Sequence, residues 1–198
     1  MSTQVKERPI LFSGNMIKAI LENRKCQTRR VIKPQAHHYS EDVLGQRKLY
    51  PCSGPDDFGD PSKAIGIPWA VGDRLWVRET WWDRKDRLPQ VQDLNAVHYG
   101  DWEPPKDMAY MHYRRPSIHM PRWAARLFLT VKAVRVERLQ DISEADARAE
   151  GYPDDSPIRI GPFLWFRGLW DSLNAKKPGC SWSDNPWIWC LSFQRIAI

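Results

Sequence analysis

The stretch Asn23-Arg24-Lys25-Cys26-Gln27-Thr28-Arg29-Arg30 follows a short apolar segment at residues 16–21. Five of its eight side chains can bond through a cation or a hydroxyl, namely Arg24, Lys25, Thr28, Arg29 and Arg30. Lys25 and Thr28 are three residues apart, so a continuing helical turn would place both on one side. An amine beside a hydroxyl is a base–nucleophile pair. A solvated basic turn after a helix is the alternative interpretation.

The residues around this stretch predict a strand, a helix and a second strand. Residues 9–12 have the apolar character of a short strand, and Ser13 can cap the helix that follows. Asn23 tolerates a left-handed conformation and can end that helix. Residues 28–32 are then expected to form a strand that Pro34 stops.

Further elements are expected along the rest of the chain. They are a strand at 75–81, a long strand at 125–139, a helix at 142–152, an amphipathic helix at 163–173 and a closing strand at 187–196. In the strand at 75–81, alternation places Leu75, Val77 and Glu79 on one face. The helix at 142–152 begins with Ser143 and Asp146, which resembles a capping box. Its last turn holds Glu150, where the helix dipole disfavours a carboxylate and a cationic partner is expected.

Two irregular stretches interrupt these elements. Residues 34–70 are rich in Pro, Gly, Ser and Asp, and we interpret them as a long excursion, either a lid over a site or a surface insertion. Residues 83–122 are a second irregular stretch. The pattern predicts a single α+β domain over residues 1–198, with a small curved sheet or barrel and insertions at about 34–70 and 83–122.

The composition favours a polyanionic or phosphate-bearing partner. The chain has 198 residues, a net charge of +6 and 11 Trp. Trp faces stack on bases but also fill cores, so RNA is only a second candidate partner beside a small molecule. The first residues lack an apolar signal core, and no apolar run approaches the roughly 20 residues of a membrane span. We therefore expect a cytoplasmic protein with no membrane partner; the sequence leaves its oligomeric state open.

The sequence predicts no metal or cofactor. The cysteines Cys26, Cys52, Cys180 and Cys190 have no paired zinc spacing and suit a reducing compartment as free thiols. None of the five histidines forms the i, i+4 pair of a metalloprotease. A phosphate-binding glycine loop and a Gly-x-Ser-x-Gly hydrolase motif are also absent from the sequence.

What remains is the Lys25–Thr28 pair with a carboxylate from elsewhere. Burial or neighbouring cations can lower a lysine pKa, and the neutral amine could then take the Thr28 proton. A glutamate would orient the pair and protonate the leaving nitrogen. Glu150 and Glu79 are the two candidates. The alternatives are an ion pair of Glu79 with Arg78 or Arg30, and an ordinary exposed helix position for Glu150.

Four motifs together resemble the ASCH domain, a member of the PUA-like β-barrel group. They are NRKCQTRR at 23–30, VGDRLWV at 71–77, DISEADARAEGY at 141–152 and NPWIWCLSF at 185–193. The resemblance runs from residue 9 to residue 193, but the two insertions match it poorly. It implies a PUA-like small β-barrel with flanking helices. The sequence is most similar in character to the Trp-rich ASCH proteins of phages and prophages.

The resemblance also implies an activity. Small bacterial ASCH proteins include N(4)-acetylcytidine amidohydrolases with a proposed Lys, Thr and Glu set, whose helix end reads Gly-Arg-Lys-Thr-x-Thr-x-Arg. The Lys falls on Lys25 and the second Thr on Thr28. The Glu lies near the end of a helix beginning Leu/Ile-Thr/Ser-Glu, which carries over to Glu150. Two positions depart from the pattern, with Asn23 in place of Gly and Cys26 in place of the first Thr.

Three functional hypotheses follow. The first is a metal-independent amidohydrolase that removes the acyl group from N(4)-acylated cytosine or cytidine. Its catalytic residues would be Lys25, Thr28 and Glu150, and its substrate-binding residues would include Arg30, Glu79, Trp76 and Trp81. The second is an RNA-binding PUA-like module whose Arg24, Lys25, Arg29 and Arg30 contact phosphates, with a ribonuclease as an intermediate case. The third is a phage accessory protein without a ligand.

Overall fold

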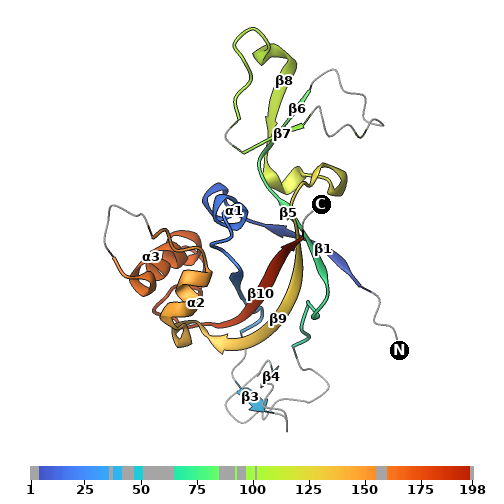
Figure 1. The fold of residues 1–198 in the computed structure, drawn as a ribbon. Helices are drawn as coiled ribbons and strands as arrows, with labels where there is room; N and C mark the ends of the chain where they lie inside the picture. The colour runs from blue at the N-terminus through green and yellow to red at the C-terminus, as the bar shows by residue number, and fades with distance from the viewer. Residues whose placement is uncertain are drawn as a thin grey trace. The chain divides into compact units, whose positions relative to one another are not determined.

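The computed structural model describes residues 5–35, 65–84, 92, 97–100, 102–154 and 160–196, together with the backbone of 38–41 and 47–50 (Figure 1). The chain divides into two compact units. The first unit comprises residues 1–23, 72–130 and 194–198, and the second comprises residues 24–71 and 131–193. The expectation of one domain with insertions stays a prediction.

The first unit is built on β1 (Glu7–Leu11), α1 (Gly14–Leu21) and β5 (Arg74–Arg78). β1 pairs in parallel with β5, and β5 pairs antiparallel with the start of β9 (Phe128–Arg138). Because neighbours flank β5 on both sides, it is a central strand, and its residues 75–77 are all buried. α1 buries Ile17, Ala19 and Ile20. The helix ends before Asn23, whose φ of 59° is left-handed as predicted.

A three-stranded sheet also belongs to the first unit. It has the order β7-β6-β8, formed by β6 (Trp81–Arg84), β7 (Val97–Tyr99) and β8 (His112–Arg115). Short 3-10 turns lie at Ala109–Met111, Ser117–His119 and Arg122–Ala124. The prediction of an irregular stretch at 83–122 is therefore wrong where these strands lie. Strands of three or four residues are too short to show an alternating apolar pattern.

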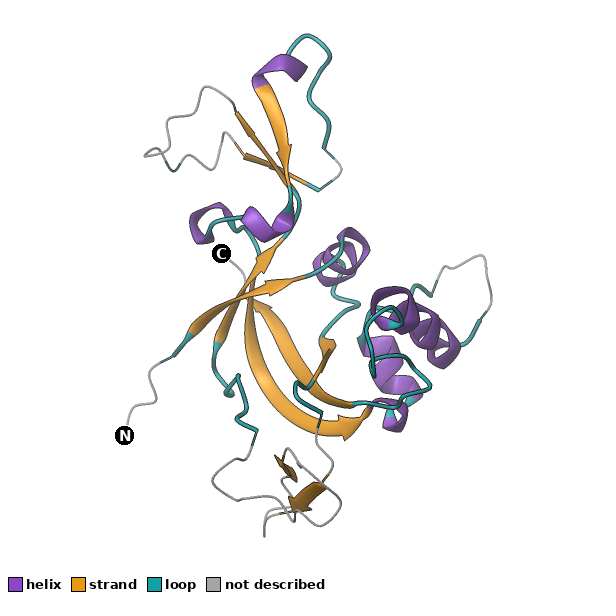
Figure 2. Ribbon diagram, turned by 180° about the vertical axis from the view of Figure 1, so that it is seen from behind, coloured by secondary structure: helices purple, strands orange, loops and turns teal. Residues whose placement is uncertain are grey.

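The second unit contains the strand order β9-β10-β2, with β2 at Gln27–Val31 and β10 at Trp187–Ile196. β10 pairs antiparallel with β2. A 3-10 turn at Leu139–Asp141 leads from β9 to α2 (Glu144–Ala149), and α3 (Pro162–Asn174) follows. Figure 2 shows α2 and α3 side by side. Apolar residues of these helices and of β10 form a core with residues of the connecting segments. The core comprises Leu139, Ile142, Ala147, Phe166, Trp170, Trp182, Ile188 and Cys190.

The first predicted insertion contains a hairpin in the described backbone. β3 (His38–Glu41) pairs antiparallel with β4 (Arg47–Tyr50). Residues 36–37, 42–46 and 51–64, which include Cys52, lie outside the described residues. The interpretation of this stretch as a lid therefore concerns residues that are largely outside them.

The predicted α+β class is confirmed. The helix and strands expected at residues 9–12, 28–32, 163–173 and 187–196 are present within a few residues of those bounds. The pairings among the described strands do not include one that closes a barrel. Within the described part of the chain, no helix has the length and apolar character needed to cross a membrane.

Candidate active site

Glu150 is placed by the two ends of α2. Ser143 caps the start of the helix, where its Oγ accepts a hydrogen bond from the Asp146 backbone N–H at 3.1 Å. Glu150 is the C-cap, and Gly151 follows with a φ of 103°, a conformation that glycine adopts at little cost. The carboxylate therefore lies at the negative end of the helix, where it needs a cation.

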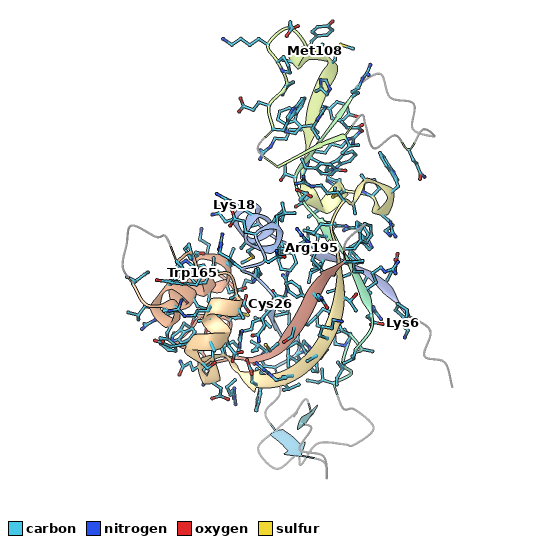
Figure 3. The ribbon with its side chains drawn as sticks, in the orientation of Figure 1. Lys6, Lys18, Cys26, Met108, Trp165 and Arg195 are labelled. Carbon is cyan, nitrogen blue, oxygen red and sulfur yellow. The ribbon has the colours of Figure 1, made fainter. Side chains whose placement is uncertain are left out.

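Lys25 meets Glu150 through the backbone as well as the side chain. The two residues form an isolated antiparallel β-bridge. The next residue, Cys26, donates its N–H to the Ala149 carbonyl at 2.9 Å and accepts from the Phe193 N–H at 2.8 Å. Figure 3 labels Cys26 beside α2. The chain at Lys25 is thus extended. Because α1 ends at Leu21, no helical turn runs from Lys25 to Thr28, so such a turn does not place the two side chains on one side.

The Glu150 carboxylate lies between two buried cations. Lys25 Nζ donates to Glu150 Oε2 at 2.5 Å and to the Glu150 carbonyl oxygen at 2.9 Å. Arg29 Nη1 donates to the other carboxylate oxygen at 3.1 Å. The side chains of Lys25 and Glu150 are 0% and 3% exposed. The cationic partner expected for Glu150 is therefore present, and the exposed-helix alternative is wrong.

Arg29 is the centre of an acidic network that the sequence did not indicate. Its guanidinium also lies 2.9 Å from Glu137 Oε1 and 3.4 Å from Asp146 Oδ2. Its Cζ atom is 5.7 Å from the ring centre of Phe166 in α3. Glu137 is 108 residues away in sequence, so no local pattern joins it to Arg29. The one signal that the sequence offers for Arg29 is the alternation of side chains along β2, which places Arg29 on the same face as Gln27.

Burial sets the electrostatics of Lys25. The loss of water lowers the pKa of Lys25 below its ordinary value, although the attraction of Glu150 opposes this shift. Arg30 and Arg29 lower the pKa further by like-charge repulsion. A buried amine of lowered pKa next to a carboxylate is the arrangement used for proton transfer in many active sites.

Thr28 is buried in the same segment, with 3% of its surface exposed. It lies opposite Leu191 in the register of β2 and β10. Alternation along β2 places Thr28 and Arg30 on one face and Arg29, which binds Glu150, on the other. The structure therefore brings Lys25 and Glu150 into contact, whereas the approach of Thr28 to that pair stays a prediction.

Arg30 lies in β2 of the second unit, whereas the predicted residues Glu79, Trp76 and Trp81 belong to the first unit. Glu79 forms a two-pronged ion pair with Arg126, with both N–O distances 2.9 Å, rather than with Arg78 or Arg30. Arg78 instead covers the ring of Trp76, with its Cζ atom 4.7 Å from the ring centre. Trp76 and Trp81 are 7% and 2% exposed. Both rings are packed within the protein, so neither offers a free face for a pyrimidine.

The described residues hold no group of three or more His, Cys, Asp or Glu side chains that could bind a metal ion. Cys26, Cys180 and Cys190 are free thiols, of which Cys26 is exposed.

Comparisons with known proteins assign no family. No protein-family model matches the sequence, and no curated protein matches it. Among solved structures, the chain is similar to the crystal structure of protein EF3133 from Enterococcus faecalis V583, described as family-model DUF984. The match has 9% sequence identity and a TM-score of 0.43, and covers 98% of this chain and 82% of that one.

Proposed function

We propose that the protein is an amidohydrolase that removes the acyl group from N(4)-acylated cytosine or cytidine. The observation that carries the proposal is the buried contact of 2.5 Å between Lys25 Nζ and Glu150 Oε2. An ion pair is costly to bury, and replacing such pairs by well-packed apolar residues is often neutral or stabilising. A role in proton transfer explains why an amine and a carboxylate are kept together there.

The proposed reaction moves one proton along this pair. Neutral Lys25 takes the proton of the Thr28 hydroxyl, and Oγ attacks the acyl carbon to form a tetrahedral intermediate. The Lys25 ammonium passes a proton through Glu150 to the N4 nitrogen, the C–N bond breaks and cytidine leaves. Water then hydrolyses the Thr28 ester by the reverse proton path, releasing a carboxylic acid. Because alternation places Thr28 on the face of β2 opposite Arg29, the first step requires a shift of β2 that brings the Thr28 hydroxyl to Lys25.

A PUA-like small barrel is part of the same proposal. Its support is the order of the four sequence motifs together with the adjacent strands β9, β10 and β2 in the second unit. Arg30 is kept in the proposal as a substrate-binding residue; its support is that its charge is close enough to act on Lys25 and on Glu150. Trp76 and Trp81 are left out of substrate stacking because their rings are buried.

The alternative of an RNA-binding module is less well supported by the geometry. Lys25 and Arg29 have side chains that are 0% exposed, so neither reaches a phosphate. Arg24 donates to the carbonyl oxygen of Gly151 at 2.8 Å. The alternative needs these three cations to bind phosphates, but all three are engaged by groups of the protein itself. The geometry gives equally little support to a ribonuclease that would use them to bind RNA.

The test is incubation of the protein with N(4)-acetylcytidine, with cytidine release followed by chromatography. Thr28→Ala and Lys25→Ala should each lower turnover by at least ~100-fold, the lower range for a lost acid–base group. Cys26→Ala is the matched control, because Cys26 is exposed and adjacent to Lys25. No cytidine release by the wild-type protein, or near wild-type rates in both variants, would reject the proposal.

A further inference from the structure

The first unit contains a pocket that is lined by none of the proposed catalytic residues Lys25, Thr28 and Glu150. Its volume is about 370 Å³, and all of its lining residues belong to that unit. The lining includes the apolar side chains of Phe12, which precedes α1, and of Ile17 and Leu21, which belong to α1. The volume lies in the range of pockets for small organic ligands and is too large for a bare inorganic ion.

Arg126 lines this pocket and is held there by two hydrogen bonds and a ring contact. Its Nε and Nη2 donate to the two carboxylate oxygens of Glu79, each at 2.9 Å. Its Cζ atom also lies 4.3 Å from the ring centre of Tyr99, another lining residue. Because Glu79 is 1% exposed and Arg126 is 40% exposed, the pair joins a buried anchor to an accessible donor.

The remaining charges around the pocket are positive. Arg114 and Lys18 line it, and Figure 3 labels Lys18 on α1. Lys18 lies 3.9 Å from Glu22, but this pair is exposed and therefore weak. Glu79 offsets Arg126, so Arg114 and Lys18 supply the net positive charge of the lining. The first turn of α1 contains no acidic residue, and its backbone N–H groups add positive potential.

We propose that this pocket binds a phosphomonoester of nucleotide size. The cationic side chains suit a dianionic phosphate, for which arginine offers a planar donor fork. The apolar lining residues suit the organic part of the ligand. Both a free nucleotide and the 5′ end of an RNA strand carry such a phosphate group. The inference does not depend on the amidohydrolase proposal, because none of the residues proposed as catalytic lines the pocket.

The experiment is calorimetric titration of the full chain with the four nucleoside 5′-monophosphates and with the four matching nucleosides. We expect at least one monophosphate to bind about tenfold or more tightly than its nucleoside, as charge-assisted hydrogen bonds predict. Arg114→Gln and Lys18→Gln should each weaken that binding, the first by about tenfold. Lys106→Gln is the matched control, since Lys106 is an exposed cation of the same unit outside the pocket.

A second arm identifies the source of the phosphate. A short RNA with and without a 5′-phosphate is titrated into the same proteins. Tighter binding of the phosphorylated RNA than of the mononucleotide assigns the site to a strand end, and the reverse assigns it to a free nucleotide. Equal affinities for phosphorylated and unphosphorylated ligands, absence of binding, or wild-type affinity in both Arg114→Gln and Lys18→Gln would overturn the proposal.

Discussion

Lys25 and Glu150 lie 125 residues apart in sequence, yet their charged groups are 2.5 Å apart in the second unit. Arg29 holds the second oxygen of the same carboxylate. Lys25 and Glu150 are buried and compensate each other, whereas Arg29 is also compensated by Glu137 and Asp146. Removing Lys25 or Glu150 should therefore affect stability as well as the proposed activity.

The first prediction concerns the folding stability of this pair. Glu150→Gln leaves Lys25 and Arg29 without their shared anion and should lower the free energy of unfolding by about 3–5 kcal/mol. Lys25→Met should cost less, because Arg29 still compensates Glu150. Urea denaturation measures both, with the exposed Lys18→Met as a control expected within about 0.5 kcal/mol of wild type. Losses below about 1 kcal/mol in both site variants would show that the pair does not stabilise the fold.

The second prediction concerns the pH dependence of stability. Burial lowers the pKa of Lys25 from 10.5 in the folded protein, so in the interval below 10.5 the unfolded chain binds a proton that the folded chain does not. Unfolding then takes up a proton, and the free energy of unfolding rises with pH through this interval. The wild-type protein should gain stability relative to Lys25→Met as the pH is raised towards 10.5.

Cys190 changes the free energy of unfolding with pH in the opposite direction, so its contribution must be removed from that measurement. Burial raises the pKa of Cys190 from 9.0 to about 12, so the unfolded thiol loses its proton first and stability falls with rising pH. The comparison of lysine with methionine at position 25 is therefore made in a Cys190→Ala background. If the free energy of unfolding has the same pH slope with either residue in that background, the lowered pKa assigned to Lys25 is wrong.

The third prediction concerns thiol reactivity. Cys26 is exposed, whereas Cys190 is buried with a raised pKa, and the thiolate is the reactive form. At about pH 8, iodoacetamide should modify Cys26 at least ~100-fold faster than Cys190. Peptide mapping by mass spectrometry follows each cysteine separately. Similar rates at the two positions in the folded protein would show that Cys190 is accessible, and unfolding in urea supplies the control in which both react.

The fourth prediction concerns Glu79 and Arg126. Arg126→Gln leaves the buried Glu79 carboxylate without its guanidinium and should lower the free energy of unfolding by about 2 kcal/mol. The double variant Glu79→Gln/Arg126→Gln should recover part of that loss in the free energy of unfolding, because no charge is then buried alone. Thermal or urea unfolding of the two single variants and the double variant measures the coupling. Strictly additive losses would mean that the pair contributes no interaction energy.

Local sequence patterns predicted the helices and strands better than they predicted which residues are in contact. The alternation at Trp187–Ile196 predicted a strand with the bounds that the structure shows. The position of Glu150 at a helix end correctly indicated a cation nearby, because the helix dipole is a local property. The partners Arg29–Glu137 and Glu79–Arg126 are 108 and 47 residues apart, and no periodicity encodes such distant pairs. The extended chain at Lys25 is set by its pairing with Glu150, a partner 125 residues away that no local pattern indicates.

The second unit is made of two segments, residues 24–71 and 131–193, with a segment of the first unit between them in sequence. During synthesis the amine at position 25 therefore emerges well before its acid partner. At the usual ribosomal speed, 125 residues correspond to a delay on the order of ten seconds. Through that time the amine is hydrated and charged, so the buried contact between Lys25 and Glu150 can form only late in translation.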